Sequence, residues 1–222
     1  GNDERALGEF IYPQPVFDVD TVLETIEAER ITYFPGPPTI FHSLLEHPVL
    51  DDHDVSSLRL SLTVSADVPV ELIQRMLDRL TLDRVIQAYG MTECGTATYT
   101  LSTDSAEVVA TTVGVACTDL ELRIVDENNQ PVATREAGEI VVRGNAVMDR
   151  YLDDDSATAA TIDSEGWLHT GDKSMCNADG YYKILGRIKE MIIVGGFNVY
   201  PAEVEDMMRE HSDIEDAAII VV

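Results

Sequence analysis

The chain has few residues of the kind that build disulfide frameworks or zinc sites. Its three cysteines, Cys94, Cys117 and Cys176, are widely spaced and form no CxxC pair. A disulfide-stabilised domain or a structural zinc site needs cysteines paired at close spacing, so the sequence disfavours both classes. Three isolated thiols are typical of a reducing compartment.

Basic residues are scarce as well. The 222 residues carry 15 Lys and Arg against 41 Asp and Glu, a formal net charge of −26, and the lysines are only Lys173, Lys183 and Lys189. Nucleic acid needs a basic binding surface, so we expect no nucleic-acid partner. The acids are scattered and form no single acidic tail. We interpret them as the mark of a halophilic protein, because high salt screens self-repulsion; a merely acidic protein is the alternative.

Long apolar runs are absent. No stretch approaches the roughly 18 residues of a membrane span, and residues 1–10 lack the basic-then-apolar pattern of a signal peptide. We therefore expect a cytoplasmic protein without a membrane span. With 45% hydrophobic residues the chain can bury a substantial core, which argues against global disorder. The sequence favours neither a monomer nor a homo-oligomer.

The first half of the chain has the pattern of an α/β unit. Apolar residues alternate over residues 58–64, recur at helical spacing over 70–80 and run together over 85–88. Two strands joined by a helix predict a parallel pair with a right-handed crossover. The loops Ser65-Ala66-Asp67 and Tyr89 to Glu93 then lie together at the carboxyl edge, where open α/β sheets bind ligands.

Other segments predict a change of architecture along the chain. Two helices are expected upstream, from Asp18 and over Thr39 to Glu46, with a short strand from Ile31 to Phe34 between them. Residues of about 113–186 indicate a mostly antiparallel β subdomain. Its strands are predicted at Glu121 to Val125, Glu139 to Arg143 and Tyr181 to Leu185. Further on, we expect a helix from Pro201 to about Arg209 and an apolar strand over 217–222.

Four spaced sequence motifs suggest the chemistry. They are Tyr89-Gly90-Met91-Thr92-Glu93, Gly166-Trp167-Leu168-His169-Thr170-Gly171-Asp172, Gly186-Arg187-Ile188-Lys189, and Gly195 to Pro201 running into Ala202-Glu203-Val204-Glu205. Any one alone is weak. In this order, and over about Phe17 to Val222, the chain resembles the adenylate-forming, AMP-binding superfamily, in particular its acyl-CoA synthetases.

The resemblance implies an α/β fold in three parts. Residues 1–112 would be the α/β nucleotide-binding portion of the large N-terminal domain, and residues 113–188 its β-rich subdomain. Residues 189–222 would be the hinge and the start of a small, mobile α+β C-terminal domain.

The resemblance also implies a site for ATP and Mg²⁺. Tyr89 would lie flat on the adenine, next to Gly90, although a tyrosine at a strand end is also common in cores. Thr92 would offer its hydroxyl to phosphate, and Glu93 would be the metal ligand. Mg²⁺ prefers one or two carboxylates together with phosphate oxygens, so Glu93 should bind it well only with nucleotide present.

The remaining nucleotide contacts are implied by residues later in the chain. Asp172 would accept hydrogen bonds from both ribose hydroxyls, and Arg187 would reach ribose or phosphate oxygens. Ile184 would help to wall the pocket, unless it is ordinary strand core. The loop Ser65-Ala66-Asp67 would border the nucleotide, although many relatives have Gly-Gly-Ala there and hence a more permissive backbone.

Three further residues are implied for the second step of the family's reaction, the transfer of the acyl group to coenzyme A. Lys189 matches the hinge about which the C-terminal domain rotates, although an exposed surface lysine is the alternative. Gly195 and Gly196 resemble the glycines that face the pantetheine arm of coenzyme A (CoA), where a backbone without Cβ permits close approach.

The implied activity is ATP-dependent ligation of a carboxylic acid to CoA through an acyl-adenylate, with small-molecule acid, ATP and CoA as partners. The segments Ala66-Asp67-Val68-Pro69 and Val194 to Asn198 look most like the corresponding segments of ligases for fatty acids and bulky hydrophobic acids. One alternative is an adenylation domain that loads a carrier-protein thiol. Another is a non-catalytic nucleotide-binding remnant.

The resemblance places the family's phosphate loop and adenylating lysine outside these 222 residues, so the chain reads as an internal piece of an enzyme. We therefore predict that the purified chain shows no significant adenylation on its own. The measurement is pyrophosphate release with ATP and a panel of carboxylic acids. Robust acid-dependent release would contradict this expectation.

Overall fold

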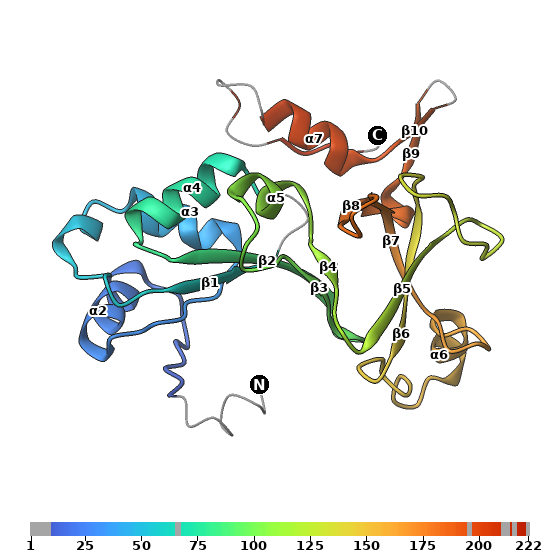
Figure 1. The fold of residues 1–222 in the computed structure, drawn as a ribbon, viewed down its shortest axis with the longest axis horizontal. Helices are drawn as coiled ribbons and strands as arrows, with labels where there is room; N and C mark the ends of the chain where they lie inside the picture. The colour runs from blue at the N-terminus through green and yellow to red at the C-terminus, as the bar shows by residue number, and fades with distance from the viewer. Residues whose placement is uncertain (1–9, 65–67, 195–196, 210–213, 215–216, 221–222) are drawn as a thin grey trace.

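The computed structural model describes residues 10–64, 68–194, 197–209, 214 and 217–220. Within these ranges the chain forms two four-stranded sheets and one two-stranded ribbon, with helices around them. Figure 1 shows the first sheet and its helices on the left and the second sheet on the right. The predicted mixed α/β class is confirmed.

The predicted β-α-β unit is present. It consists of β1 (Leu60–Thr63), α4 (Val70–Arg79) and β2 (Arg84–Met91), and β1 runs parallel to β2 with Leu60 opposite Arg84. Pro69 occupies the N-cap of α4, where its missing N–H removes no helical hydrogen bond. The buried positions of β1 are Ser61 and Thr63, while its leucines are half-buried. Ser61 is satisfied there because its hydroxyl donates to the Phe34 carbonyl at 2.9 Å.

Four helices besides α4 accompany the first sheet. They are α2 (Val19–Glu29), α3 (Pro38–Glu46), the short 3-10 helix η1 (Leu50–Asp52) and the unpredicted α5 (Ala106–Thr111). Asp18 is the cap of α2, since its carboxylate accepts from the Thr21 N–H. The apolar faces of the helices form one core whose fully buried members include Leu23, Phe41, Leu44, Leu72 and Met76.

The strand predicted at Ile31 to Phe34 is reduced to a single bridge between Tyr33 and Leu60. The Phe34 ring instead packs edge-on against Phe41, with ring centroids 5.8 Å apart. Side-chain packing and backbone hydrogen bonds to β1 therefore hold this segment without a full strand.

The structure corrects the end of β2. The strand does not stop at Ala88 but continues to Met91, turns over residues 92–94 and returns as β3 (Gly95–Tyr99), which pairs with β4 (Val115–Ala116). Tyr89 and Gly90 are therefore strand residues, with a register shift between them. A Cβ on Gly90 would lie 2.1 Å from the Gly95 carbonyl oxygen, so only glycine permits this close approach.

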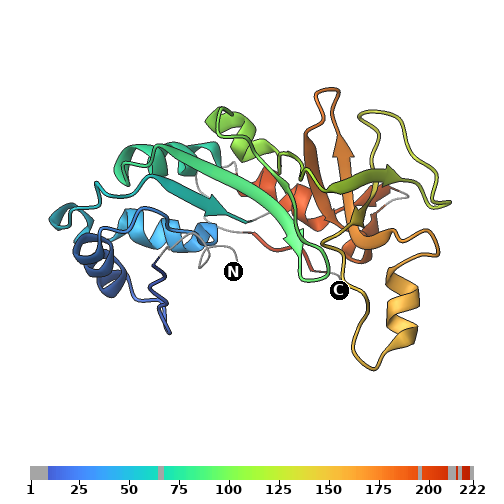
Figure 2. The ribbon, with the colours of Figure 1, turned by 60° about the horizontal axis from the view of Figure 1, so that its bottom comes forward.

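The second sheet is the predicted β-rich part. Its antiparallel order is β5 (Leu120–Val125), β6 (Gly138–Gly144), β7 (Leu168–Cys176) and β8 (Tyr182–Arg187). The connection from β6 to β7 carries α6 (Asp155–Thr161), which Figure 2 shows extending away from the sheet. The central strand β7 was not among the predicted strands, and it contains Asp172.

The last described segments follow β8. They are the 3-10 turn η2 (Ile188–Glu190), the ribbon strands β9 (Ile192–Val194) and β10 (Phe197–Val199), and α7 (Pro201–Arg209), which begins at Pro201 as predicted. Figure 1 shows α7 along the upper side, near β8. The predicted strand near the C-terminus is wrong over Ala217 to Ile220, which form no regular element. Among the described helices, none combines the length and apolar character needed to cross a membrane.

The surface ion pairs engage only part of the excess acidic charge. The cationic partners include Arg30 with Asp54 and Arg79 with Asp51, and both of these pairs are largely exposed. Such exposed pairs contribute little to stability, whereas the net charge of −26 remains as self-repulsion.

We predict that salt stabilises the fold. Raising KCl from roughly 0.1 to 1 M shortens the Debye length from about 10 to about 3 Å. Weaker repulsion worth about 2 kcal/mol would raise Tm by about 4–8 °C at this chain length. Far-UV circular dichroism melts should show this rise, and tetramethylammonium chloride, which screens equally, should reproduce it. A Tm independent of ionic strength would contradict the prediction.

Candidate functional site

Asp172 is the centre of the candidate site. It lies in the middle of β7 and is only 4% exposed. Its Oδ2 accepts a 2.6 Å hydrogen bond from the Tyr89 hydroxyl, and its Oδ1 lies 2.9 Å from Nε of Arg187. Tyr89 comes from β2 of the first sheet and Arg187 from β8, directly opposite Asp172. Three predicted site residues from three strands therefore meet at one carboxylate.

Burial dominates the electrostatics of this carboxylate. Loss of hydration raises the pKa of Asp172 above its ordinary value, while the Tyr89 hydrogen bond and the Arg187 charge act to lower the pKa. Burial and the neighbouring Asp172 carboxylate likewise raise the pKa of Tyr89, so its hydroxyl remains a donor. A carboxylate has about four acceptor positions, so Asp172 can still accept two hydroxyls of a vicinal diol.

The backbone around Asp172 is fixed by residues that the sequence analysis did not assign to the site. The Asp172 N–H donates to the Thr170 hydroxyl at 3.1 Å, and that hydroxyl donates to the Ile140 carbonyl at 2.7 Å. Glu139 accepts from the Gly171 N–H at 2.8 Å and pairs with Nδ1 of His169 at 2.8 Å. Thr170 belongs to the same sequence motif as Asp172 and could have been identified from it. Glu139 lies about 30 residues away, and no local pattern marks it.

Glu93 lies just beyond the end of β2, in the turn to β3. Its Oε1 accepts a 2.8 Å hydrogen bond from the Tyr151 hydroxyl, and its backbone carbonyl accepts from the Met148 N–H at 2.7 Å. The hydrogen bond to Glu93 is the main cause that raises the pKa of Tyr151. Tyr151 was not predicted, because its contact spans 58 residues of sequence.

The donor set around Glu93 fits a metal that is bound together with phosphate. Among the described residues no three His, Cys, Asp or Glu side chains gather into a protein-only cation site. One carboxylate beside the Thr92 hydroxyl suits Mg²⁺, which commonly takes one or two carboxylates and completes its shell with substrate phosphates and water.

The other predicted residues occupy distinct positions. Ile184 is 5% exposed within an apolar cluster against which Tyr89 also packs, so the structure places Ile184 in the core. Thr92 is exposed in the β2–β3 turn, and Lys189 is exposed in η2 directly after β8. Ser65, Ala66, Asp67, Gly195 and Gly196 lie outside the described residues.

Comparison with protein families gives a match over most of the chain. The family model described as AMP-binding enzyme matches residues 8–152. Among similar proteins, a 3-[(3aS,4S,7aS)-7a-methyl-1,5-dioxo-octahydro-1H-inden-4-yl]propanoyl:CoA ligase of Mycobacterium tuberculosis is 48% identical over 216 residues, which are 97% of this chain and 41% of that protein. A feruloyl-CoA synthase of Amycolatopsis is 38% identical over 93% of this chain and 41% of its own length.

Solved structures share the fold. The O-succinylbenzoate coenzyme A synthetase MenE of Bacillus subtilis, in complex with AMP, matches with a TM-score of 0.84 at 29% identity, covering 98% of this chain and 44% of that chain. The amide bond synthetase McbA of Marinactinospora thermotolerans matches with a TM-score of 0.83 at 32% identity, covering 93% and 42%. The chain thus spans about two fifths of the length of these proteins.

We predict that Tyr89→Phe destabilises the fold in a pH-dependent way. At neutral pH the variant should lose about 1–3 kcal/mol of unfolding free energy, because a buried carboxylate loses its donor. The loss should shrink as pH falls through the pKa of Asp172, since a protonated carboxyl depends less on that donor. Burial raises this pKa, so the shrinkage should begin at a higher pH than for an ordinary aspartate. Urea unfolding at several pH values measures it.

The control for this prediction is Tyr181→Phe. The Tyr181 hydroxyl also donates to a carboxylate, Asp104, at 2.7 Å, but Asp104 is half-exposed. Its loss should be smaller. Equal losses for the two variants, or a Tyr89→Phe loss that does not change with pH, would show that Asp172 is not the buried anchor described above.

Proposed function

Because the chain belongs to the AMP-binding enzyme family, we propose that it forms the nucleotide-binding floor of an ATP-dependent acid–CoA ligase that acts through an acyl-adenylate. One observation carries the proposal. A carboxylate buried at 4% exposure, Asp172, is held by donors from two sheets with acceptor capacity left over. A buried carboxylate that is held in place and still has free acceptor positions suits a ribose, because two adjacent ribose hydroxyls can both donate to it.

The neighbouring residues would complete the nucleotide contacts. The Tyr89 ring, whose hydroxyl is fixed by Asp172, offers a face on which adenine can stack. The exposed part of the Arg187 guanidinium can donate to ribose or phosphate oxygens. Thr92 and Glu93, in the turn after β2, would face the phosphates. Mg²⁺, held by Glu93 and phosphate oxygens, would neutralise charge that develops on the triphosphate.

The proposed reaction has two balanced steps. A carboxylate oxygen of the acid attacks the α-phosphorus of ATP, the bond to the β-phosphate oxygen breaks, and pyrophosphate leaves. The CoA sulfur then attacks the acyl carbon of the adenylate, the bond to the AMP oxygen breaks, and the thiol proton passes to solvent. The residues of this chain bind and orient the nucleotide in both steps.

The proposed division of the chain follows from these two steps. Residues 1–112 and 113–188 would form the nucleotide floor, and residues 189–222 would begin the part that moves between steps. Lys189, exposed in the short turn after β8, is placed where a few backbone torsions could turn the following segment. Gly195 and Gly196 would then face the CoA arm.

We propose a bulky hydrophobic carboxylic acid as substrate. The support is the identity of 48% and 46% to ligases of Mycobacterium tuberculosis and Rhodococcus jostii that are named for a methyl-dioxo-octahydroindenyl propanoyl group. Ligases named for flatter aromatic acids are less similar, as with feruloyl-CoA synthase at 38%.

The test is a graft. The matching segment of the Mycobacterium tuberculosis ligase is replaced by this chain, and pyrophosphate release is measured with a bicyclic propanoic acid, a fatty acid and ferulic acid. We expect acid-dependent release that is greatest with the bicyclic acid, followed by thioester formation with CoA. Thioester formed only on a carrier-protein thiol would favour the carrier-loading alternative, and no release from a folded graft would favour the non-catalytic one.

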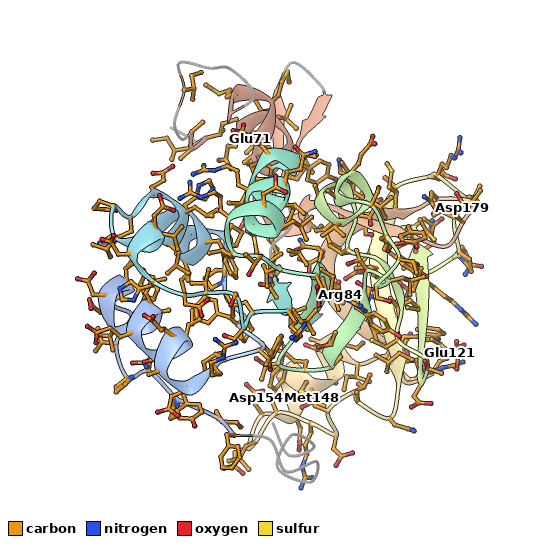
Figure 3. All side chains as sticks on the ribbon, turned by 60° about the vertical axis from the view of Figure 1, so that its left-hand side comes forward. Glu71, Arg84, Glu121, Met148, Asp154 and Asp179 are labelled. Carbon is orange, nitrogen blue, oxygen red and sulfur yellow. The ribbon has the colours of Figure 1, made fainter. Side chains whose placement is uncertain are left out.

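A matched pair of variants tests the role of Asp172 in that graft. Asp172→Asn should weaken AMP binding at least about tenfold, because the amide offers one acceptor in place of a charged pair. Asp179→Asn removes an exposed turn carboxylate at the outer edge of the second sheet (Figure 3) and should leave AMP binding unchanged. Calorimetric titration with AMP measures both. Equal affinities for the two variants would remove the ribose role of Asp172.

A further inference from the structure

The loop between β6 and α6 holds Glu93 at two points. The Tyr151 hydroxyl donates to Oε1 of the Glu93 carboxylate at 2.8 Å, and the Met148 N–H donates to the Glu93 backbone carbonyl at 2.7 Å. Among the residues that the structure describes, no side chain or backbone group donates to Oε2. One oxygen of the carboxylate is therefore fixed by the protein, while the other remains available for a ligand.

Tyr151 is itself anchored from behind. Its N–H donates to the Thr158 hydroxyl at 3.0 Å, and that hydroxyl donates to the Asp154 carbonyl at 2.8 Å. Asp154 also caps α6 by accepting from the Ala157 N–H. Figure 3 labels Met148 and Asp154, and both lie near the foot of that view, in the region of α6. The backbone of Tyr151 is thus fixed to the first turn of α6. This fixes the position of its phenol and limits the orientations that the Glu93 carboxylate can adopt.

We propose that Tyr151 is a positioning residue that aims Oε2 of Glu93 at the metal of a bound metal–nucleotide complex. The inference rests on the proposed function and adds to it a residue that lies outside the four sequence motifs. Metal-binding carboxylates are commonly oriented by a hydrogen bond to the oxygen that does not bind the metal, and loss of such a partner typically costs about 10–100-fold in metal affinity.

A purely structural tie between the two sheets is the rival explanation for the same contact. The two differ in what they predict for metal dependence. A structural tie would lower stability and activity at every metal concentration. If Tyr151 is a positioning residue, its loss would specifically weaken metal affinity, and high metal concentration would restore the maximal rate.

The experiment measures Mn²⁺ binding to the 222-residue chain in the presence of ATP by electron paramagnetic resonance. Tyr151→Phe should weaken formation of the ternary complex about tenfold or more, and Glu93→Gln at least as much. The double variant should match Glu93→Gln alone, because both changes remove the same metal contact. Tyr181→Phe, which removes a different tyrosine–carboxylate hydrogen bond, the one to Asp104, should bind as the parent chain does.

A second measurement uses the grafted ligase, so that the result does not depend on the isolated chain. Tyr151→Phe should raise the Mg²⁺ concentration at half-maximal pyrophosphate release about tenfold or more, with the maximal rate largely recovered at saturating Mg²⁺. Parent-like metal affinity in Tyr151→Phe while Glu93→Gln is impaired would overturn this inference alone. Parent-like affinity in Glu93→Gln would overturn the metal role of Glu93 and the inference with it. The same holds if the parent chain forms no ternary complex and the parent graft shows no Mg²⁺-dependent release.

Discussion

One buried carboxylate constrains the architecture of the site. Asp172 sits at 4% exposure in the central part of the second sheet, and its partners come from β2 of the first sheet and from β8. An ionised carboxylate without partners would be costly at such depth. Tyr89 and Arg187 must therefore stay close to it, and this requirement fixes how the end of the first sheet meets the second.

The same requirement organises the turn after β2. Because Tyr89 is fixed by Asp172, the four residues that follow it carry Glu93 to a set place beside the β6–α6 loop, where Tyr151 and Met148 hold it. The proposed ribose acceptor and the proposed metal ligand are thus linked through one strand end. Such a joint placement would suit the proposed chemistry, because adenylate formation needs nucleotide and metal bound together.

Sequence reasoning succeeded where the signal was local. The β-α-β unit, the helix from Asp18, the antiparallel β region and the start of α7 all follow from periodicity and turn or helix-start residues, and each was confirmed. It failed where long-range pairing decides the outcome. β2 runs on to Met91 because β3 pairs with it, and the predicted strand over Ala217 to Ile220 finds no such partner among the described residues. Within the site, Asp172, Tyr89 and Arg187 were predictable from the sequence motifs that contain them. Glu139 and Tyr151 were not, because their hydrogen bonds span 30 and 58 residues and leave no local sequence pattern.

The most direct measurement of the central claim is a crystal structure of the chain, or of the grafted ligase, with AMP. The account predicts both ribose hydroxyls within hydrogen-bond distance of Asp172, while Tyr89 still donates to the same carboxylate and its ring lies under the adenine. A ribose bound elsewhere, with Asp172 contacting only Tyr89 and Arg187, would contradict the account and leave the buried carboxylate with a structural role alone.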